Sequence, residues 1–216
     1  MPYNTPMKKY ILFDNDGVLV ETEQWYFTAS AEILKTMGID LDEERYREIM
    51  INGQSAFLLA EEQGYDRETV EAARAKRNER YQYYLRTEDI TIPGAKEVVK
   101  ALAKRFKMGI VTSALREDFE LIHQKRGIAE HMAFVLCSGE YPRAKPYPDP
   151  YLKGLEQFGA AKHEAIVVED SERGLRSAVD AGIDCVVVRN HFTRFHDFSG
   201  ATHRIDALHE LEALLR

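Results

Sequence analysis

The amino-acid sequence predicts an α/β protein whose core is a doubly wound, mostly parallel sheet with helices on both faces. Short apolar runs alternate with amphipathic stretches along most of the chain. A long helical segment interrupts this alternation once, after the first apolar run. Carboxylates and small hydroxylic residues follow several of the runs, where the strands of such a sheet would end. Together these observations predict a sheet domain with a helical insertion and a polar site at one sheet edge.

Short apolar runs predict the strands, because strands that are covered on both faces are apolar throughout. In chain order they are Tyr10–Phe13, Met108–Val111, Phe134–Cys137, Ala165–Val168 and Cys185–Val188. Amphipathic patterns between them predict helices over Ala95–Arg105, Glu117–Arg126, Pro150–Phe158 and Arg173–Ala181. Strands and helices that alternate in this way form parallel sheets.

The segment from about Thr22 to Thr87 contains no strand candidate and shows only helical periodicity. Its short amphipathic helices are predicted over Ala29–Thr36, Asp42–Ile51, Ala56–Gln63 and Arg67–Leu85. Glycines fall between these helices, where helices usually stop, and Pro93-Gly94 marks the return to the sheet. We therefore predict a core domain formed by residues 1–21 and 88–216 and a four-helix insertion over residues 22–87.

Composition limits the partners that this chain can have. The formal net charge of −7 over 216 residues argues against nucleic acid and anionic membranes, because both favour a basic surface. A small anionic substrate remains compatible, since a few basic groups can define a pocket in an acidic protein. The two cysteines, Cys137 and Cys185, give neither a disulfide framework nor metal-thiolate spacing, and we expect both to be buried thiols. Residues 1–9 lack the apolar stretch of a signal peptide and no run reaches membrane-spanning length, so we expect a cytoplasmic protein.

The most informative motif is Asp14-Asn15-Asp16-Gly17, which directly follows the first predicted strand. Carboxylates two residues apart at a strand end point to the same side of the chain. One could attack an electrophile while the other moves a proton, and their mutual repulsion would favour a bound divalent cation. An ordinary Asp/Gly turn after a strand explains the tetrapeptide equally well.

Further polar groups lie after or between later strands. They are Thr112-Ser113-Ala114, Lys145 ahead of a proline-rich turn, and Glu169-Asp170-Ser171. The hydroxyls and amides of the first group could hold phosphate oxygens. Taken singly, the first and last groups could be helix caps and the lysine a solvated surface charge. Their joint occurrence at the strand ends favours a single site.

The order of these groups resembles that of the haloacid dehalogenase-like hydrolases. The matching motifs are Phe13-Asp14-Asn15-Asp16-Gly17-Val18-Leu19, Val111-Thr112-Ser113, Lys145-Pro146-Tyr147-Pro148-Asp149 and Val168-Glu169-Asp170-Ser171. The chain is most similar to the subgroup that carries a helical cap after the first strand, which includes phosphoglycolate phosphatases, small sugar phosphatases and β-phosphoglucomutases. The resemblance implies a Rossmann-like core and a cap domain. Relatives mostly have an apolar residue at the position of Asn15, for which the sequence suggests no partner.

The resemblance also implies roles for the site residues. Asp14 would attack phosphorus to form an aspartyl-phosphate, and Asp16 would protonate the leaving oxygen and then activate water. Mg²⁺ would be bound by Asp14, the Asp16 backbone carbonyl and Asp170, with Glu169 ligating directly or through water. Thr112, Ser113 and Lys145 would balance charge on the phosphoryl oxygens, and Ala114 of the same turn would contact the substrate. Dehalogenases of the superfamily lack the second aspartate, so Asp16 favours phosphoryl chemistry.

The expected activity is Mg²⁺-dependent hydrolysis of a small phosphate ester, such as a sugar or polyol phosphate, by a monomer or weak dimer. In the predicted cap and its hinge, Glu21 and Arg77 are the candidate substrate contacts. The alternative for Glu21 is a hydrogen bond to the hinge backbone, and the alternative for Arg77 is a solvated charge on a helix face. A β-phosphoglucomutase-like mutase is the alternative, although the His and cap arginine common in those relatives are absent here. A non-catalytic protein that binds a phosphorylated metabolite is a more remote alternative.

Overall fold

The computed structural model describes residues 8–51 and 53–216. Contacts within the chain divide it into two compact units. The first comprises the chain before Thr22 and from Thr91 onward, and the second comprises Thr22–Ile90. We describe each unit by itself.

The first unit is built on a six-stranded sheet with the strand order β3-β2-β1-β4-β5-β6, and all neighbouring strands are parallel. The strands are β1 Tyr10–Phe13, β2 Lys107–Val111, β3 Phe134–Leu136, β4 Ala165–Glu169, β5 Asp184–Val188 and β6 His203–Ile205. The chain runs outward from β1 through β2 and β3 and then crosses to β4 on the other side of β1, so the strand order reverses between β1 and β4. Ligands usually bind at this point, beyond the carboxyl ends of the strands.

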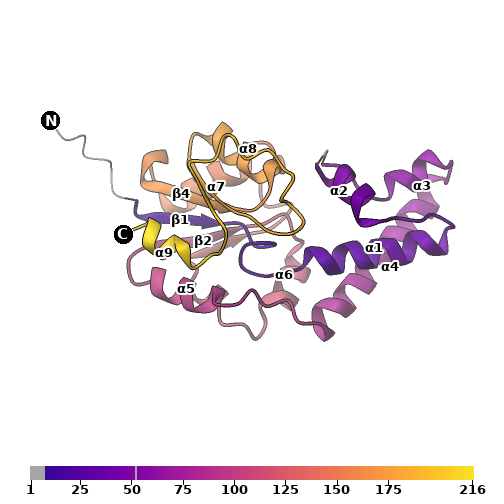
Figure 1. Ribbon diagram of the computed structural model, residues 1–216, viewed down its shortest axis with the longest axis horizontal. Helices are drawn as coiled ribbons and strands as arrows, with labels where there is room; N and C mark the ends of the chain where they lie inside the picture. Colours follow the sequence, from indigo (N-terminus) through magenta and orange to yellow (C-terminus); the bar gives the residue numbers. More distant parts are fainter. Residues whose placement is uncertain (1–7, 52) are drawn as a thin grey trace. The chain divides into compact units, whose positions relative to one another are not determined.

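Helices cover both faces of this sheet (Figure 1). They are α5 Ala95–Leu102, α6 Arg116–His123, α7 Asp149–Phe158, α8 Glu172–Ala181 and α9 Glu210–Leu214, with short 3₁₀ turns at Ala129–His131 and Lys162–Glu164. Successive strand residues point to opposite faces, so Ile11 and Phe13 pack with α5 and α9 while Leu12 packs with α7 and α8. Two apolar cores therefore hold the central strands from both sides.

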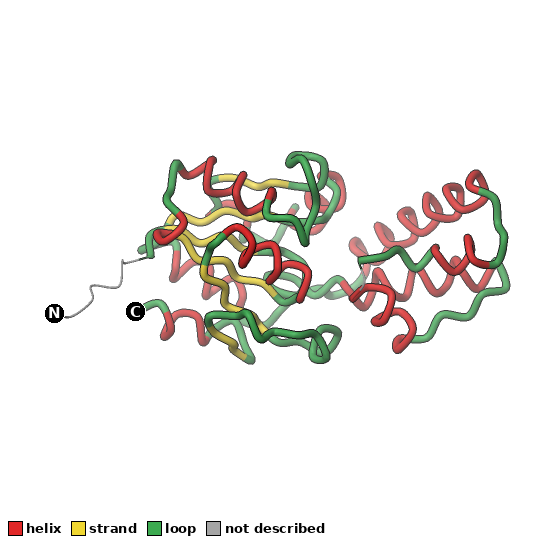
Figure 2. The backbone as a smooth tube through the Cα atoms, turned by 90° about the horizontal axis from the view of Figure 1, so that it is seen from above, coloured by secondary structure: helices red, strands yellow, loops and turns green. Residues whose placement is uncertain are grey.

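Helices joined by loops make up the described part of the second unit (Figure 2). It contains α1 Glu23–Thr36, α2 Glu43–Ile51, α3 Leu58–Glu62 and α4 Arg67–Thr87. Its buried side chains form a core of their own around Leu34, Tyr46 and Phe57. The long α4 begins at a capping residue, because the Asp66 side chain accepts a hydrogen bond of 2.8 Å from the Thr69 amide.

The predicted α/β class, the five predicted strands and the helices between them are confirmed. The prediction missed β6, since His203 and Arg204 are exposed and Ile205 alone is buried, which leaves no apolar run. Helix α1 begins at Glu23 rather than Ala29. The helical unit extends beyond the predicted Thr87 to Ile90, whose side chain is fully buried. Both cysteines are buried and free.

None of the helices within the described ranges is both long and apolar enough to cross a membrane.

Candidate active site

Lys145 joins two carboxylates beneath the carboxyl ends of the central strands. Its Nζ atom lies 2.6 Å from Oδ1 of Asp14 and 2.7 Å from Oε1 of Glu169, and it also donates to the Val111 carbonyl at 3.0 Å. Asp14 directly follows β1, and Glu169 is the last residue of β4. All three charged side chains are buried. The fold therefore brings Asp14, Lys145 and Glu169, which lie far apart in the sequence, together as a buried ion cluster.

Burial and charge act in opposite directions on these groups. Burial, which the Lys145 ammonium opposes, raises the pKa of Asp14 to about 7. Burial also disfavours the Lys145 ammonium, but the Asp14 and Glu169 carboxylates outweigh it and raise the pKa of Lys145 above its usual range. Glu169 is disfavoured as a carboxylate by burial, yet Lys145 and the hydrogen bonds from Tyr151 and Ser171 lower its pKa. Lys145 and Glu169 are thus a charged pair at neutral pH.

Hydrogen bonds from the protein occupy both oxygens of Glu169. Oε1 accepts from Lys145 Nζ and from the Tyr151 hydroxyl, each at 2.7 Å. Oε2 accepts from the Asp170 amide at 3.0 Å and from the Ser171 amide and hydroxyl at 3.1 and 3.0 Å. A Cβ atom at Gly174 would lie 1.7 Å from Oε1, so helix α8 needs glycine there to pass this carboxylate. The arrangement suits Glu169 to hold Lys145 and the start of α8.

Thr112 links the end of β2 to Asp16. Its hydroxyl donates to Oδ2 of Asp16 at 3.3 Å and accepts from the Ala114 amide at 3.0 Å. The Thr112 carbonyl accepts a hydrogen bond of 2.8 Å from the buried Tyr141 hydroxyl. Asp16 and the residues at 113–114 are only half-buried, in contrast to Asp14 and Thr112. This side of the cluster is therefore the more exposed to solvent.

Asp170 is the third carboxylate of a cluster that could hold a metal ion. One oxygen each of Asp14, Glu169 and Asp170 lie within 4.8 Å of one another. Asn190 orients Asp170, because its Nδ2 donates to Oδ2 at 2.7 Å while its Oδ1 accepts from the Thr193 amide and hydroxyl, both at 3.0 Å. Hard carboxylate oxygens in this number fit Mg²⁺, which is bound by few carboxylates and completes its shell with water and phosphate oxygens.

Comparison with known proteins identifies the family. Residues 11–188 match the family model described as haloacid dehalogenase-like hydrolase. The chain belongs to the haloacid dehalogenase-like hydrolases. It is 31% identical to the protein CbbY of Cereibacter sphaeroides, with 96% of each chain covered. It is 29% identical to an N-acetylmuramic acid 6-phosphate phosphatase of Pseudomonas aeruginosa, covering 84% of this chain and 81% of the relative.

The fold of a solved relative is also similar to that of this haloacid dehalogenase-like hydrolase. A crystal structure of a CbbY variant from Rhodobacter sphaeroides in complex with xylulose-(1,5)bisphosphate has a TM-score of 0.81 at 26% identity. The match covers 95% of this chain and 96% of that chain. The likeness therefore extends over the sheet and the inserted helices alike.

Asn190 contacts the candidate site of this hydrolase and was not among the predicted site residues. It lies in the loop that follows β5, and its side chain donates a hydrogen bond to Asp170. Phe192 and Thr193 of the same loop are buried, and only its outer residues, such as Phe195, are exposed. The signal that could have found Asn190 is its position just beyond the carboxyl end of β5.

Asn15, for which the sequence suggested no partner, is fully buried and contacts a helix residue. Its Oδ1 lies 2.7 Å from Nε2 of His123, near the end of α6. Its Nδ2 donates a long hydrogen bond of 3.4 Å to Oδ2 of Asp16. The acidic motif is thus tied to the helix that follows the Thr112 turn.

The remaining predicted contacts are Glu21 and Arg77. Glu21 is half-buried and is the last residue before the helical unit. Arg77 is buried within that unit, so its alternative interpretation as a solvated charge was wrong. Its guanidinium carbon lies 4.2 Å from the Tyr26 ring centroid, and its Nε donates to Asn78 Oδ1 at 2.9 Å. A role in substrate binding stays a prediction for both residues.

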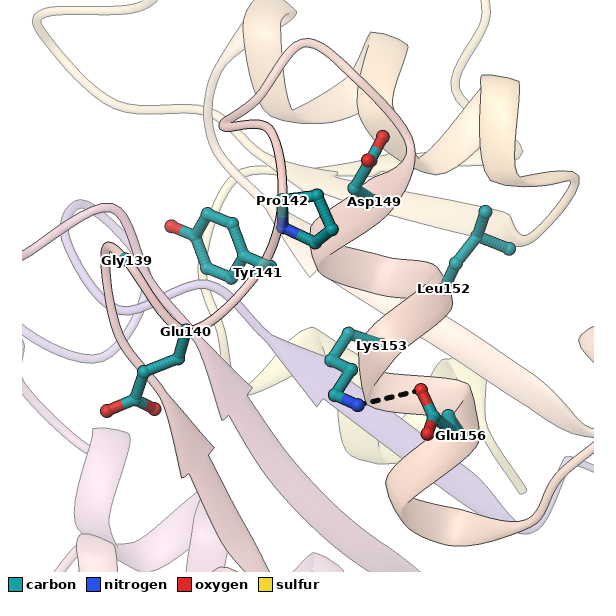
Figure 3. Close-up of a pocket in the computed structure, with 8 residues that line it drawn as sticks. All are labelled: Gly139, Glu140, Tyr141, Pro142, Asp149, Leu152, Lys153 and Glu156. Carbon is teal, nitrogen blue, oxygen red and sulfur yellow. Dashed lines mark hydrogen bonds and ion pairs between the residues drawn. The ribbon is translucent and has the colours of Figure 1, made fainter.

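An open cavity of about 750 Å³ lies beside the loop that carries Lys145 (Figure 3). It is lined by Gly139, Glu140, Tyr141, Pro142, Asp149, Leu152, Lys153 and Glu156. Its three carboxylates are paired with Arg116, Arg143 and Lys153. This lining has more carboxylates than cations, so it does not suit a phosphate ester.

Proposed function

We propose that this protein is a Mg²⁺-dependent phosphomonoesterase that hydrolyses a small phosphorylated metabolite, such as a sugar or polyol phosphate, through an aspartyl-phosphate on Asp14. The observation that carries the proposal is the buried contact of 2.6 Å between Lys145 Nζ and Asp14 Oδ1, at a sheet edge shared with Asp16, Thr112 and Asp170. Asp14 would be the nucleophile of phosphoryl transfer, Asp16 would transfer the proton, and Lys145 would supply positive charge.

The cluster formed by the Asp14, Glu169 and Asp170 carboxylates fits Mg²⁺, the metal that such chemistry uses. Asp14, the Asp16 backbone carbonyl and Asp170 would hold Mg²⁺. We assign Glu169 an indirect role, because both of its oxygens already accept hydrogen bonds from the protein. When bound, Mg²⁺ supplies positive charge that offsets the repulsion between the carboxylates and a phosphate dianion.

The reaction would have two steps, formation and hydrolysis of the aspartyl-phosphate. In the first, a carboxylate oxygen of Asp14 attacks phosphorus, the phosphorus–oxygen ester bond breaks, and Asp16 gives its proton to the leaving alkoxide. In the second, Asp16 accepts a proton from water, whose oxygen attacks phosphorus and releases phosphate and the Asp14 carboxylate. Lys145 would offset the negative charge of the phosphoryl oxygens throughout. Thr112, Ser113 and the Ala114 amide would bind these oxygens once the Thr112 hydroxyl and the Ala114 amide exchange their hydrogen bonds within the protein for the phosphate.

The names of the relatives support a small phosphate ester as the substrate. One is a phosphatase of N-acetylmuramic acid 6-phosphate, and a solved relative is in complex with a sugar bisphosphate. We propose Glu21 and Arg77 as contacts to the part of the substrate beyond the transferred phosphate. We further propose a cytoplasmic monomer or weak dimer without a nucleic acid partner.

A test of this function combines a generic substrate with a panel of sugar and polyol phosphates. The purified protein should hydrolyse 4-nitrophenyl phosphate with Mg²⁺ and stop when EDTA is added. Asp14→Asn should abolish turnover. Absence of hydrolysis with every ester, or an Asp14→Asn variant as active as the wild type, would refute the proposal. Conversion of β-glucose 1-phosphate to glucose 6-phosphate with a bisphosphate primer would identify a mutase instead.

A further inference from the structure

The contact between Asn15 and His123 lies behind the catalytic acid pair and has no part in the mechanism above. Asn15 is fully buried, and His123 is 8% exposed. The separation between His123 Nε2 and Asn15 Oδ1 is 2.7 Å, at the short end of the ordinary range for an N–H···O hydrogen bond. The Phe119 ring packs against the imidazole at a centroid distance of 4.5 Å. Both side chains are therefore held in one arrangement by the core.

The surroundings of Asn15 determine which side chain donates and which accepts in this hydrogen bond. The amide of Asn15 faces the Asp16 carboxylate on one side and His123 on the other. Its NH₂ group must face the carboxylate, since a carbonyl oxygen there would meet another acceptor. The Asn15 oxygen then faces His123, so Nε2 carries the proton and donates it. Burial and the nearby Arg126 guanidinium lower the pKa of His123 to about 4, consistent with a neutral imidazole.

This arrangement leaves one nitrogen of the imidazole without a partner. Among the described residues, nothing forms a hydrogen bond with the buried Nδ1 of His123. An unpaired buried nitrogen typically costs about 1–3 kcal/mol. A leucine at this position would fill the core without that cost. The hydrogen bond of Nε2 to Asn15 is therefore what the histidine provides here that an apolar side chain would not.

The bond matters because of what lies at its other end. Oδ2 of Asp16 accepts hydrogen bonds from Thr112 Oγ1 at 3.3 Å and from Asn15 Nδ2 at 3.4 Å. Both bonds are long, so neither alone fixes the carboxylate. The Asn15 carbonyl also accepts from the Leu19 amide at 2.8 Å, which holds the loop that carries Asp16. Asn15 is thus bound at both its backbone and its side chain.

We propose that Asn15 and His123 are positioning residues for Asp16: His123 orients the Asn15 amide, and the amide holds the Asp16 carboxyl where it transfers its proton to the leaving group. The inference rests on the proposed phosphatase function. General acid catalysis depends on placement within hydrogen-bond reach of the leaving oxygen, and a small displacement is costly. Loss of the pair should slow the protonation step and leave Asp14 and Lys145 in place.

The leaving group separates this role from a purely structural one. A 4-nitrophenolate is a stable anion and departs with little help from an acid, whereas a benzyl alkoxide is strongly basic and needs the proton. For both esters, kcat/KM reports the steps up to formation of the aspartyl-phosphate. The ratio of kcat/KM for 4-nitrophenyl phosphate to that for benzyl phosphate is independent of the amount of folded enzyme. A defect in Asp16 raises this ratio, and a loss of folded protein leaves it unchanged.

The experiment measures this ratio for His123→Leu, Asn15→Leu and the double variant. The double variant removes both polar groups together, so it folds where a single variant leaves a buried partner unpaired. We expect the ratio to rise about tenfold in each variant. His123→Gln, whose amide can donate in place of Nε2–H, should keep the ratio within about twofold of the wild type. His131→Gln, at a half-buried position on a 3₁₀ turn, is the matched control.

The outcomes separate the two proposals. A wild-type protein that hydrolyses both esters, with an unchanged ratio in the folded double variant, would overturn the role of the pair alone. A His123→Gln variant with the same raised ratio as His123→Leu would also overturn it. A wild-type protein that hydrolyses neither ester would overturn the proposed function, and the role of the pair with it.

Discussion

Nζ of Lys145 lies 2.6 Å from Oδ1 of Asp14, and the same nitrogen lies 2.7 Å from Oε1 of Glu169. One buried cation therefore compensates two buried acids at the ends of different strands. Removing it leaves two acids close together in a medium that solvates them poorly.

Lys145→Met should accordingly destabilise the fold as well as abolish activity. The expected loss is about 3–5 kcal/mol in the free energy of unfolding, measured by urea denaturation in the presence of EDTA. Lys153→Met is the control, because Lys153 makes an exposed pair with Glu156 that contributes at most about 1 kcal/mol. A Lys145→Met variant as stable as the control would mean that the cluster is not ionised as described.

The depressed pKa of His123, about 4 in the folded chain against an ordinary value of 6.5, predicts a pH dependence of stability. Between these values the unfolded state binds the proton and the folded state does not, so stability falls as the pH decreases. Protonation of His123 in the unfolded state lowers the free energy of unfolding by about 3 kcal/mol once the pH is below about 4. His123→Gln, which cannot titrate, should lose less stability than the wild type between pH 7 and pH 4. Equal losses measured by urea denaturation would contradict this prediction.

The sequence predicted the strands and the site at their ends because both follow from local patterns. Apolar runs such as Ala165–Val168 identify buried strands, and Asp14 and Thr112 follow their strands directly. The edge strand β6 lacked such a pattern, since His203 and Arg204 are exposed.

The partners of the site residues could not be predicted in this way. His123 lies 108 residues from Asn15 along the chain, and Asn190 lies 20 residues from Asp170. His123 carries no local signal, and the position of Asn190 beyond a predicted strand does not indicate its partner. The partners of both residues depend on which strands and helices become neighbours. Tertiary contacts of this kind become visible only once the sheet order is known.

Asn190→Ala should weaken metal binding, because Asn190 Nδ2 holds Oδ2 of Asp170 at 2.7 Å. Loss of such a hydrogen bond to a metal-binding carboxylate typically reduces affinity about 10–100-fold. Titration of Mg²⁺ by calorimetry should show a reduction in this range, with kcat at saturating Mg²⁺ changed less. His191→Ala, at the exposed neighbouring position, should leave the affinity unchanged. Equal affinities for the two variants would remove Asn190 from the metal site.

Gly17→Ala tests how tightly the acidic motif packs against Asp170. The backbone of Gly17 has φ of +77°, a region that alanine rarely adopts. An added Cβ would also lie 2.2 Å from Oδ2 of Asp170 and 2.8 Å from Nδ2 of Asn190, which would displace both side chains. We therefore expect Gly17→Ala to lose Mg²⁺ affinity in the same calorimetric titration. Gly38→Ala has a similar φ of +76° with nothing within 4 Å of the added Cβ, so it carries the backbone strain alone. Equal Mg²⁺ affinities for the two variants would show that the close approach to Asp170 is unimportant for the metal site.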